Sequence, residues 1–575
     1  MRQSWFLLAL AAIGAMGRLC VAANHPIPGT AKGFGGEPSP NSRRPNVLLV
    51  CVDDLKPVLG CYGDKTVKSP HIDRLASRGM TFDLAYCNQA VCSPSRNSLL
   101  TGLRPQTLGI YDLSTNFRKA RPEALTLPRH FRDQGYKTQG IGKIFHVGHG
   151  NTEDPASWSV PHFQAKTIGY ALPENSAKQT REGAFFENQS PNNLPKGAPF
   201  ENADVGDGAY GDGKIADEAI KRIRDAAKNP REPVFLALGF LKPHLPFCAP
   251  KKYWDLYDRE SFTLAGVSRP PRGAPSFAPT NSGELRNYRD IPSEGAPDEN
   301  LQRTLIHGYH ACVSYMDAQL GRVLDELERS GLADNTIIVL WGDHGWHLGD
   351  HGLWCKHTNY EQATRIPLIV SAPEKVRPGS HSASLTETVD IYPTLCELAG
   401  IPVPKGLDGR SFADVLQNPR LKPKAFVQHV YPRGELLGRA LRTDRYRLVE
   451  WKKPGDAASS AILELYDYKS DPHETKNLAE DEPDIARSLQ NHFSLMREAK
   501  KQVRPELAGK PRPADRDALF QKKDKNRDGK LSREEFLADQ PDPDQAPRRF
   551  DQFDTDHNGE LSREEFVTQG GRLKK

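Results

Sequence analysis

The sequence predicts an α/β fold, with a large and mainly parallel sheet covered by helices. Continuously apolar segments of strand length, typical of buried parallel strands, occur at 46–52, 234–240, 336–341 and 367–372. Helical patterns alternate with them, at 71–79, 95–101, 124–134, 213–228 and 302–329. This alternation is typical of a sheet with helices on both faces.

The N-terminal residues predict export. Residues 5–16 form a short apolar run after Arg2 and end near the small residues Val21-Ala22-Ala23, as in a signal peptide at 1–23. The run is too short to span a bilayer, and no other stretch is long and apolar enough to do so. Residues 24–43, rich in Pro, Gly and Ser, predict a flexible lead. We therefore expect a secreted or periplasmic protein without a membrane span.

Composition narrows the class of protein further. The net charge of +5 is small against 78 basic and 73 acidic side chains, so the charge predicts no nucleic-acid partner. Nine cysteines, eight of them after residue 23, are scattered without CxxC spacing. The sequence therefore indicates neither a disulfide framework nor a zinc site. Pairing of some cysteines stays open, and the oligomeric state cannot be predicted.

The pattern changes along the chain. Within the first domain, residues 262–300 are rich in Pro, Gly and Ser and predict a long surface insertion. Short strands at 426–430 and 439–451 then predict a small antiparallel subdomain. We therefore predict a main domain at 44–420 and a subdomain at 421–500. A linker rich in Pro, Lys and Arg follows at 501–515, and a pair of repeats occupies 516–575.

The repeats predict calcium binding. Residues 524–535 and 554–565 match the EF-hand loop, with oxygen-bearing side chains at positions 1, 3 and 5, Gly at 6 and Glu at 12. Position 7 of such a loop contributes a backbone carbonyl. The predicted ligands are Asp524, Asn526, Asp528, Lys530, Glu535, Asp554, Asp556, Asn558, Glu560 and Glu565. The alternative is a charged disordered tail, which two matching loops thirty residues apart disfavour.

Acidic residues after two predicted strands favour a metal site. Asp53 and Asp54 follow the first strand, and Asp343 and His344 follow the strand at 336–341. Ligands of open α/β sheets gather beyond the carboxyl ends of strands. Carboxylates brought together there repel one another unless a hard cation neutralises them. The alternative role for an Asp after a strand is a turn or a helix N-cap.

Cys92 begins the run Cys92-Ser93-Pro94-Ser95-Arg96, which opens a helix-like stretch. A cationic neighbour, Arg96, and a helix N-terminus both favour an anionic group at residue 92. As an unmodified thiol, however, Cys92 has no base next to it in sequence. The alternative is a buried cysteine that acts as a small apolar residue.

The run from Cys92 to Arg96 resembles the C-x-P-S-R signature of the sulfatase family, in the alkaline phosphatase superfamily. The resemblance covers about residues 44–482, and Gly-Trp-His-Leu-Gly-Asp-His-Gly at 345–352 is similar to the iduronate-2-sulfatase group. Many other sulfatases have Asn where His344 stands. The other matching segments are 53–54, 101–102, 142–146, 242–244, 342–344, 354–356, 465–467, 471–474 and 477–478.

The resemblance implies an exported, calcium-dependent sulfatase that hydrolyses sulfate esters of sulfated sugars or polysaccharides. Its nucleophile would be a hydrated formylglycine, made from Cys92 by a formylglycine-generating enzyme. The resemblance implies one Ca²⁺ at Asp53, Asp54, modified Cys92, Asp343 and His344.

The resemblance also assigns roles to the basic residues. Asp343 would activate the hydrate, which Arg96 would steady. Lys143, Lys356 and His244 would bind the sulfate, with His244 or Lys356 protonating the leaving group. His146 would be the base that expels sulfate and restores the aldehyde.

Several alternatives stay open. Lys143 or Lys356, taken alone, could be an exposed surface lysine. The segment Lys242-Pro243-His244 could be only a rigid loop. The chain could be a phosphoryl hydrolase of the same superfamily, or a non-catalytic calcium-binding protein. The sugar, the sulfate position and the choice between exo and endo action cannot be predicted.

Overall fold

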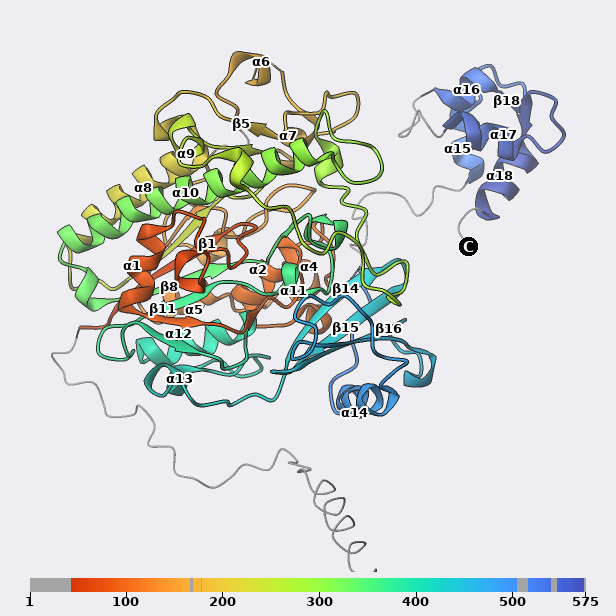
Figure 1. Cartoon of the computed structure of the whole chain (residues 1–575). Helices are drawn as coiled ribbons and strands as arrows, with labels where there is room; N and C mark the ends of the chain where they lie inside the picture. The colour runs from red at the N-terminus through yellow and green to blue at the C-terminus, as the bar shows by residue number, and fades with distance from the viewer. Residues whose placement is uncertain (1–42, 166–168, 177, 504–515, 539–545, 573–575) are drawn as a thin grey trace, which may run out of the picture. The chain divides into compact units, whose positions relative to one another are not determined.

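The computed structural model describes residues 43–165, 169–176, 178–503, 516–538 and 546–572 (Figure 1). The chain divides into two compact units, one ending at Lys501 and the other beginning at Gln502. The predicted signal peptide, nearly all of the predicted lead and most of the predicted linker lie outside the described residues. Within the described part of the chain, no helix is both long and apolar enough to cross a membrane.

A seven-stranded sheet forms the centre of the first unit, in the order β12-β2-β11-β8-β1-β6-β4. β1 lies between β8 and β6 and is parallel to both, and β4 is parallel to β6. β11 is antiparallel to both of its neighbours, so the sheet is mostly rather than wholly parallel. The strands are β1 (Asn46–Val52), β2 (Met80–Phe82), β4 (Lys137–Gly142), β6 (Val234–Phe240), β8 (Thr336–Gly342), β11 (Leu368–Ser371) and β12 (Ser380–Ser382).

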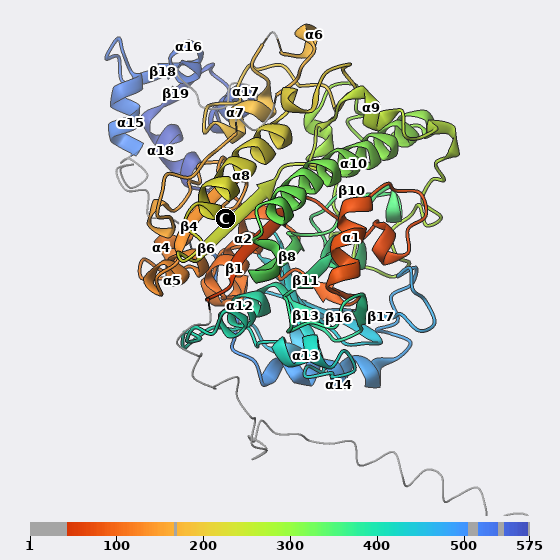
Figure 2. The same cartoon turned by 90° about the vertical axis from the view of Figure 1, so that its left-hand side faces the viewer.

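Helices cover both faces of this sheet, which confirms the predicted α/β class (Figure 2). Alternate residues of β1 face opposite layers, as the two-residue period of a strand requires. Leu48, Val50 and Val52 pack in the same apolar cluster as α1 (Pro70–Arg78), α8 (Gly211–Ala227) and α10 (Glu299–Arg329). The residues between them pack with α2 (Cys92–Thr101), α5 (Leu127–Asp133) and α12 (Ile391–Ala399).

The C-terminal part of the first unit is a four-stranded antiparallel sheet, backed by α14 (Pro483–Ser494). Its strands are β14 (Val427–Arg433), β15 (Leu436–Arg442), β16 (Tyr446–Lys452) and β17 (Ile462–Asp467). The single strand predicted at 439–451 is wrong, because the chain reverses between β15 and β16. Thr443 closes this turn, donating its backbone N–H to the Tyr446 carbonyl at 2.8 Å.

The insertion predicted at 262–300 is irregular but not confined to the surface. It contains the short helical turn η5 (Leu285–Asn287), and Leu285 and Tyr288 are buried. Composition indicated loops correctly, but it could not show that the middle of the segment turns inward.

The second unit consists of two helix–loop–helix repeats. β18 (Lys530–Ser532) and β19 (Glu560–Ser562) pair antiparallel through Leu531 and Leu561. The flanking helices are α15 (Arg516–Lys523), α16 (Arg533–Leu537), α17 (Ala546–Phe553) and α18 (Arg563–Arg572). Their aromatic side chains form a small core with the two leucines, at Phe520, Phe536, Phe550, Phe553 and Phe566.

Candidate active site

The candidate site lies at the carboxyl edge of the main sheet, where four strands end at one level. Val52 of β1 pairs with Phe240 of β6 and with Gly342 of β8. Gly142 of β4 pairs in the same way with Gly239. The residues that follow these strand ends are Asp53, Asp54, Lys143, the segment 241–246, Asp343 and His344.

Gly239 allows β6 to approach the chain that leaves β4. Lys143 donates its backbone N–H to the Gly239 carbonyl at 2.9 Å. A Cβ at residue 239 would lie 2.2 Å from the Lys143 carbonyl oxygen, a distance that no side chain tolerates. A glycine is therefore required where Lys143 enters the site.

Cys92 is the first residue of α2 and is buried. Its Sγ lies 3.4 Å from His344 Nε2 and 3.9 Å from Lys143 Nζ. Burial raises the pKa of the thiol to about 12, and the Asp53 charge acts in the same direction. An unmodified Cys92 would therefore ionise little near neutral pH and would be a poor nucleophile.

Arg96 lies one turn further along α2 and is fully buried. It contacts several parts of the site. It contacts Asp53 Oδ1 at 3.0 Å and Asp343 Oδ2 at 2.9 Å. It also donates to the backbone carbonyls of Lys143 and Ile144. The guanidinium thus fixes two carboxylates from different strands, as its planar fork of donors allows.

The predicted ligands in the first unit converge. One side-chain atom each of Asp53, Cys92, Asp343 and His344 lies within 4.8 Å of the others, and so do atoms of Asp53, Asp54, Cys92 and His244. Burial raises the pKa of Asp54 well above its ordinary value, even with Lys356 beside it. The site thus holds carboxylates that lack a full set of counter-charges.

The chemistry of this donor set fits a divalent cation. His344 Nδ1 lies 3.1 Å from the Gly345 carbonyl, which can only accept a hydrogen bond, so Nε2 is the ring nitrogen that faces the carboxylates. That Nε2 lies 3.4 Å from Asp54 Oδ1 and 3.6 Å from Asp343 Oδ1. Three carboxylates and an imidazole nitrogen suit a hard cation, although the imidazole makes the set less purely oxygen than a typical calcium site.

The predicted sulfate-binding cations lie against the metal-site carboxylates. Lys143 donates to Asp53 Oδ2, and Lys356 Nζ lies 3.0 Å from Asp54 Oδ1. His244 Nε2 is 3.9 Å from Asp54 Oδ2. Burial, Lys356 and Lys143 together lower the pKa of His244 to about 4. The two ammonium groups and the His244 ring therefore border one small, buried volume.

His146 lies at the edge of this group. Its Nε2 is 3.3 Å from His149 Nδ1, and its buried Nδ1 has no hydrogen-bond partner among the described residues. Burial and the nearby Lys143 charge lower the pKa of His146 well below its ordinary value. The ring is therefore neutral near neutral pH.

In the EF-hand loops, Asp554, Asp556 and Glu565 present carboxylate oxygens within 4.8 Å of one another. In the first loop, Asp524 accepts from Asp528 and Gly529, and Glu535 accepts from Lys525. The side chains of Lys530 and Glu560 pair with each other at 2.8 Å. Position 7 of an EF-hand loop binds the metal through its backbone carbonyl, so this side-chain pair leaves that ligand in place. Asn526 and Asn558 hydrogen-bond within their own loops.

The site also contains residues that the sequence did not single out. Glu284 Oε1 lies 2.6 Å from Lys356 Nζ and 3.2 Å from His244 Nε2. His357, adjacent to Lys356, lies 3.9 Å from Glu284 Oε2, and His149 stacks on His146. Proximity to predicted residues was the only signal for the two histidines. No sequence signal marked Glu284.

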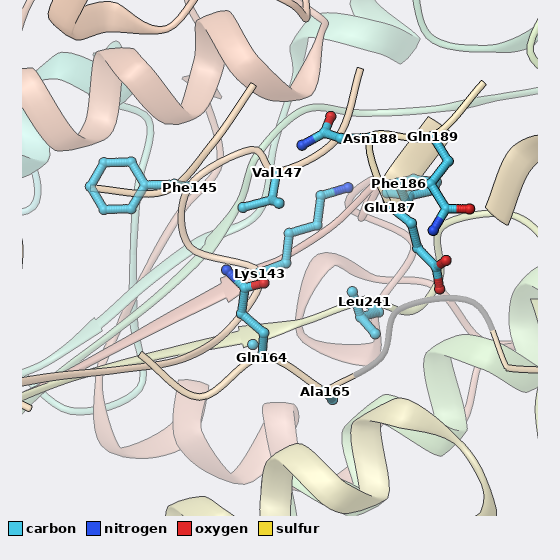
Figure 3. Close-up of a pocket in the computed structure, with 11 residues that line it drawn as sticks. Lys143, Phe145, Val147, Gln164, Ala165, Phe186, Glu187, Asn188, Gln189 and Leu241 are labelled. Atoms are coloured by element: carbon cyan, nitrogen blue, oxygen red, sulfur yellow. The ribbon is translucent and has the colours of Figure 1, made fainter. Parts of the chain in front are cut away.

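A cavity of about 460 Å³ opens beside Lys143 (Figure 3). Figure 3 shows the lysine side chain extending between Val147 and Phe186. Lys143 Nζ lies 5.3 Å from the Phe186 ring centre, and the rings of Phe186 and His244 are 5.6 Å apart. The wall is completed by Gly142, Phe145, Gln164, Ala165, Glu187, Asn188, Gln189 and Leu241.

Comparison with known families decides the identity. The model of the sulfatase family matches residues 45–401, more than half of the chain. The chain is a member of the sulfatase family. A model of the C-terminal region of N-sulphoglucosamine sulphohydrolase matches residues 349–501, and an EF-hand model matches 516–538 and 548–568.

Curated relatives of this sulfatase include two iduronate 2-sulfatases. The human enzyme is 35% identical over 525 residues, covering 78% of this chain and 94% of the relative. The mouse enzyme is 38% identical over 392 residues, covering 62% of this chain and 69% of the relative. A sulfatase of Formosa agariphila is 32% identical, covering 76% and 83%. The sulfatase is thus a sulfuric ester hydrolase similar to iduronate 2-sulfatase.

Solved structures support the fold. A structure described as a complex with its substrate D-glucosamine-2-N,6-O-disulfate superposes with a TM-score of 0.61 at 23% identity, covering 79% of this chain and 98% of that one. The phosphonate monoester hydrolase of Agrobacterium radiobacter gives 0.60 at 21% identity, covering 79% and 95%. At these identities the similarity concerns the fold alone.

Proposed function

We propose that this sulfatase is exported, requires Ca²⁺, and removes sulfate from sulfated sugars by means of a formylglycine formed from Cys92. The observation that carries the proposal is the position of Cys92 Sγ. It lies in one 4.8 Å group with three candidate metal ligands and 3.9 Å from the Lys143 ammonium. A nucleophile, a metal site and a cation for the anionic ester would thus share one buried volume.

The metal would be held by Asp53, Asp54, residue 92, Asp343 and His344. A bound Ca²⁺ would polarise the sulfate and compensate the buried carboxylates. Arg96 keeps Asp53 and Asp343 in place through its two ion pairs, so the ligand positions do not depend on the metal alone.

The protein residues have separable roles in our proposal. Asp343 takes the proton from the formylglycine hydrate, whose oxygen attacks sulfur. Lys143, Lys356 and His244 hold the sulfate and stabilise the charge that develops on it. His244 or Lys356 donates a proton to the leaving alcohol.

His146 completes the cycle. Because its ring is neutral and its Nδ1 has no partner in the described structure, His146 is free to take the proton of the second hydrate hydroxyl. Loss of that proton expels sulfate and restores the aldehyde.

The cavity beside Lys143 supports a sugar as the rest of the substrate. Its volume falls within the range of small-molecule sites, about 300–1,000 Å³. Its wall combines Phe145, Val147, Phe186 and Leu241 with the amides of Gln164, Asn188 and Gln189, a mixture that suits a sugar ring. Similarity to the iduronate 2-sulfatases makes a 2-sulfated uronic acid the first substrate to test.

Mass spectrometry tests the nucleophile. The tryptic peptide 79–96 contains both Cys87 and Cys92. After alkylation, Cys92 should carry an aldehyde and Cys87 an alkylated thiol, which makes Cys87 an internal control. Active enzyme in which both cysteines remain thiols would contradict the mechanism.

Paired substrates test the reaction class. Aryl sulfate should be hydrolysed far faster than the matching aryl phosphate, and Cys92→Ala should lose this activity while retaining its fold. Faster phosphate hydrolysis would favour the phosphoryl hydrolase alternative. A panel of defined sulfated saccharides then identifies the sugar. Release of sulfate only from uronic acids that are sulfated at C2 would support iduronate-type specificity.

A further inference from the structure

Glu284 reaches the sulfate-binding cations from within the irregular 262–300 segment. The segment is fixed here because Trp354 donates its backbone N–H to Ser282 Oγ at 3.0 Å. Trp354 belongs to β10 (Trp354–Cys355), and Lys356 follows directly. This hydrogen bond therefore helps to set the position of Glu284 relative to Lys356, in addition to the ion pair between them.

One carboxylate oxygen of Glu284 contacts both Lys356 and His244. Oε1 accepts from Lys356 Nζ at 2.6 Å and lies 3.2 Å from His244 Nε2. Lys356 has three N–H donors, of which one points to Glu284 and another to Asp54. One donor thus remains for an anion, and its direction is determined by the two carboxylates.

The second carboxylate oxygen has no such partner. Glu284 Oε2 is buried and accepts no hydrogen bond from the described residues, and His357 Nδ1 lies 3.9 Å away. Burial acts to raise the pKa of this carboxyl, but the Lys356 charge and the hydrogen bond with His244 outweigh it and hold the pKa well below its ordinary value. A buried anionic oxygen without a donor is costly, so the site calls for a donor from a ligand.

The chemistry of that donor is restricted by its surroundings. A sulfate oxygen cannot donate, and its negative charge would be repelled by Glu284. A sugar hydroxyl next to the sulfate ester carries a proton, has no charge, and accompanies the sulfate into the site. A carboxylate accepts such a hydrogen bond strongly.

We propose that Glu284 is a specificity-determining residue of this sulfatase, in which Oε1 holds Lys356 and His244 and Oε2 accepts a hydrogen bond from the sugar hydroxyl adjacent to the sulfate. The inference rests on the proposed sugar sulfatase function. It assigns to the irregular segment the recognition of the ring that carries the sulfate.

Deoxy analogues test this contact through binding, so turnover is not needed. In the full-length Cys92→Ala protein with Ca²⁺, calorimetry compares methyl 2-O-sulfo-α-L-iduronide with its 3-deoxy analogue. Methyl 6-O-sulfo-glucosaminide and its 4-deoxy analogue form the second pair, because C4 carries the hydroxyl nearest to a 6-sulfate. At least one hydroxyl-bearing sugar should bind roughly 10- to 100-fold more tightly than its analogue, the value of a hydrogen bond to a charged group.

Adding Glu284→Ala should remove this preference, so that both members of the pair bind equally. Glu284→Gln, which keeps the size of the side chain, should weaken the preference and serves if the alanine variant does not fold. Glu294→Ala is the matched control, because Glu294 is an exposed glutamate of the same segment. It should leave the preference unchanged.

Three results would overturn the proposal: equal binding of hydroxyl and deoxy sugars in the parent, an unchanged preference after Glu284→Ala, or no binding of either pair. A purely structural role would weaken both members of a pair equally. Turnover of 4-methylumbelliferyl sulfate by the unmutated enzyme separates these results from failure of the proposed function, since this substrate has no hydroxyl beside its sulfate.

Discussion

Replacing Arg96 with Met tests how the buried charges of the site depend on one another. Arg96 has no exposed surface and contacts Asp53 and Asp343 at 3.0 and 2.9 Å. A methionine fills much of the same space but supplies no charge and no N–H donor. Asp53 and Asp343 would then remain buried without this counter-charge.

The structure sets the expected size of the effect. Removing one partner of a buried ion pair costs about 3–5 kcal/mol, so the free energy of unfolding should fall by that amount in EDTA. If Ca²⁺ binds Asp53 and Asp343 as proposed, saturating Ca²⁺ should compensate part of the lost charge and reduce the penalty. Arg129→Met is the control, because Arg129 forms an exposed pair with Asp133, worth about 0.3–0.5 kcal/mol.

Urea denaturation followed by tryptophan fluorescence measures these differences. The first unit contains six tryptophans in its described part, and the sequence has none from 502 to 575, so the signal is independent of the EF-hand repeats. A penalty below 1 kcal/mol in EDTA would refute the buried-pair reasoning. A full penalty that Ca²⁺ leaves unchanged would instead refute the placement of the metal.

Three further predictions concern separate parts of the chain. Lys143→Ala should lower kcat/KM for an aryl sulfate by about 100- to 1,000-fold, whereas the control variant Lys137→Ala, at the surface, should not. Equal activity of the two variants would exclude a role of Lys143 in catalysis. Glu565→Gln should weaken Ca²⁺ binding by the second EF-hand loop at least tenfold in calorimetry, and an unchanged titration would contradict that loop assignment. Asp317 accepts from the backbone N–H of Ile72 at 2.7 Å, and burial raises its pKa to about 7. Because its folded pKa lies above its unfolded value, its contribution to stability is present below about pH 4 and is lost as pH rises to about 7. The stability of the native protein relative to Asp317→Asn should therefore fall by up to about 4 kcal/mol across that range in urea titrations, and a rising difference would contradict the sign.

The strands of the central sheet could be predicted from the sequence because their burial leaves a pattern in the local sequence. A strand covered on both faces is continuously apolar, and the segment predicted at 234–240 is β6 with the same bounds. The segment 439–451 was misjudged because apolar residues on both sides of Thr443-Asp444-Arg445 gave one extended pattern. The three polar residues between them form the turn, and nothing in the strand pattern itself marked the break.

The sequence could supply candidate residues for the site but not the geometry that brings them together. Asp54 and Asp343 are 289 residues apart, yet the Asp54 N–H donates to Asp343 Oδ1 at 3.0 Å. That contact follows from the register of β1 against β8, which a single sequence does not contain. Glu284 escaped prediction for a related reason, since the composition of an irregular segment reports its average character and not which side chain turns inward.

The balance of buried charges gives a physical reason to expect a divalent cation at the strand ends. Three cationic side chains, Arg96, Lys143 and Lys356, face four carboxylates, those of Asp53, Asp54, Asp343 and Glu284. The neighbouring His146 and His244 have lowered pKa values and add no charge at neutral pH. With all four carboxylates ionised, the site alone would be negative by one charge, and the raised pKa of Asp54 shows that burial disfavours this state. A divalent cation at these carboxylates would favour their ionised form and make the site positive by one charge, which suits a sulfate ester. On this argument the metal would do more than polarise the sulfate, since without it the three cations would be occupied by the protein's own carboxylates.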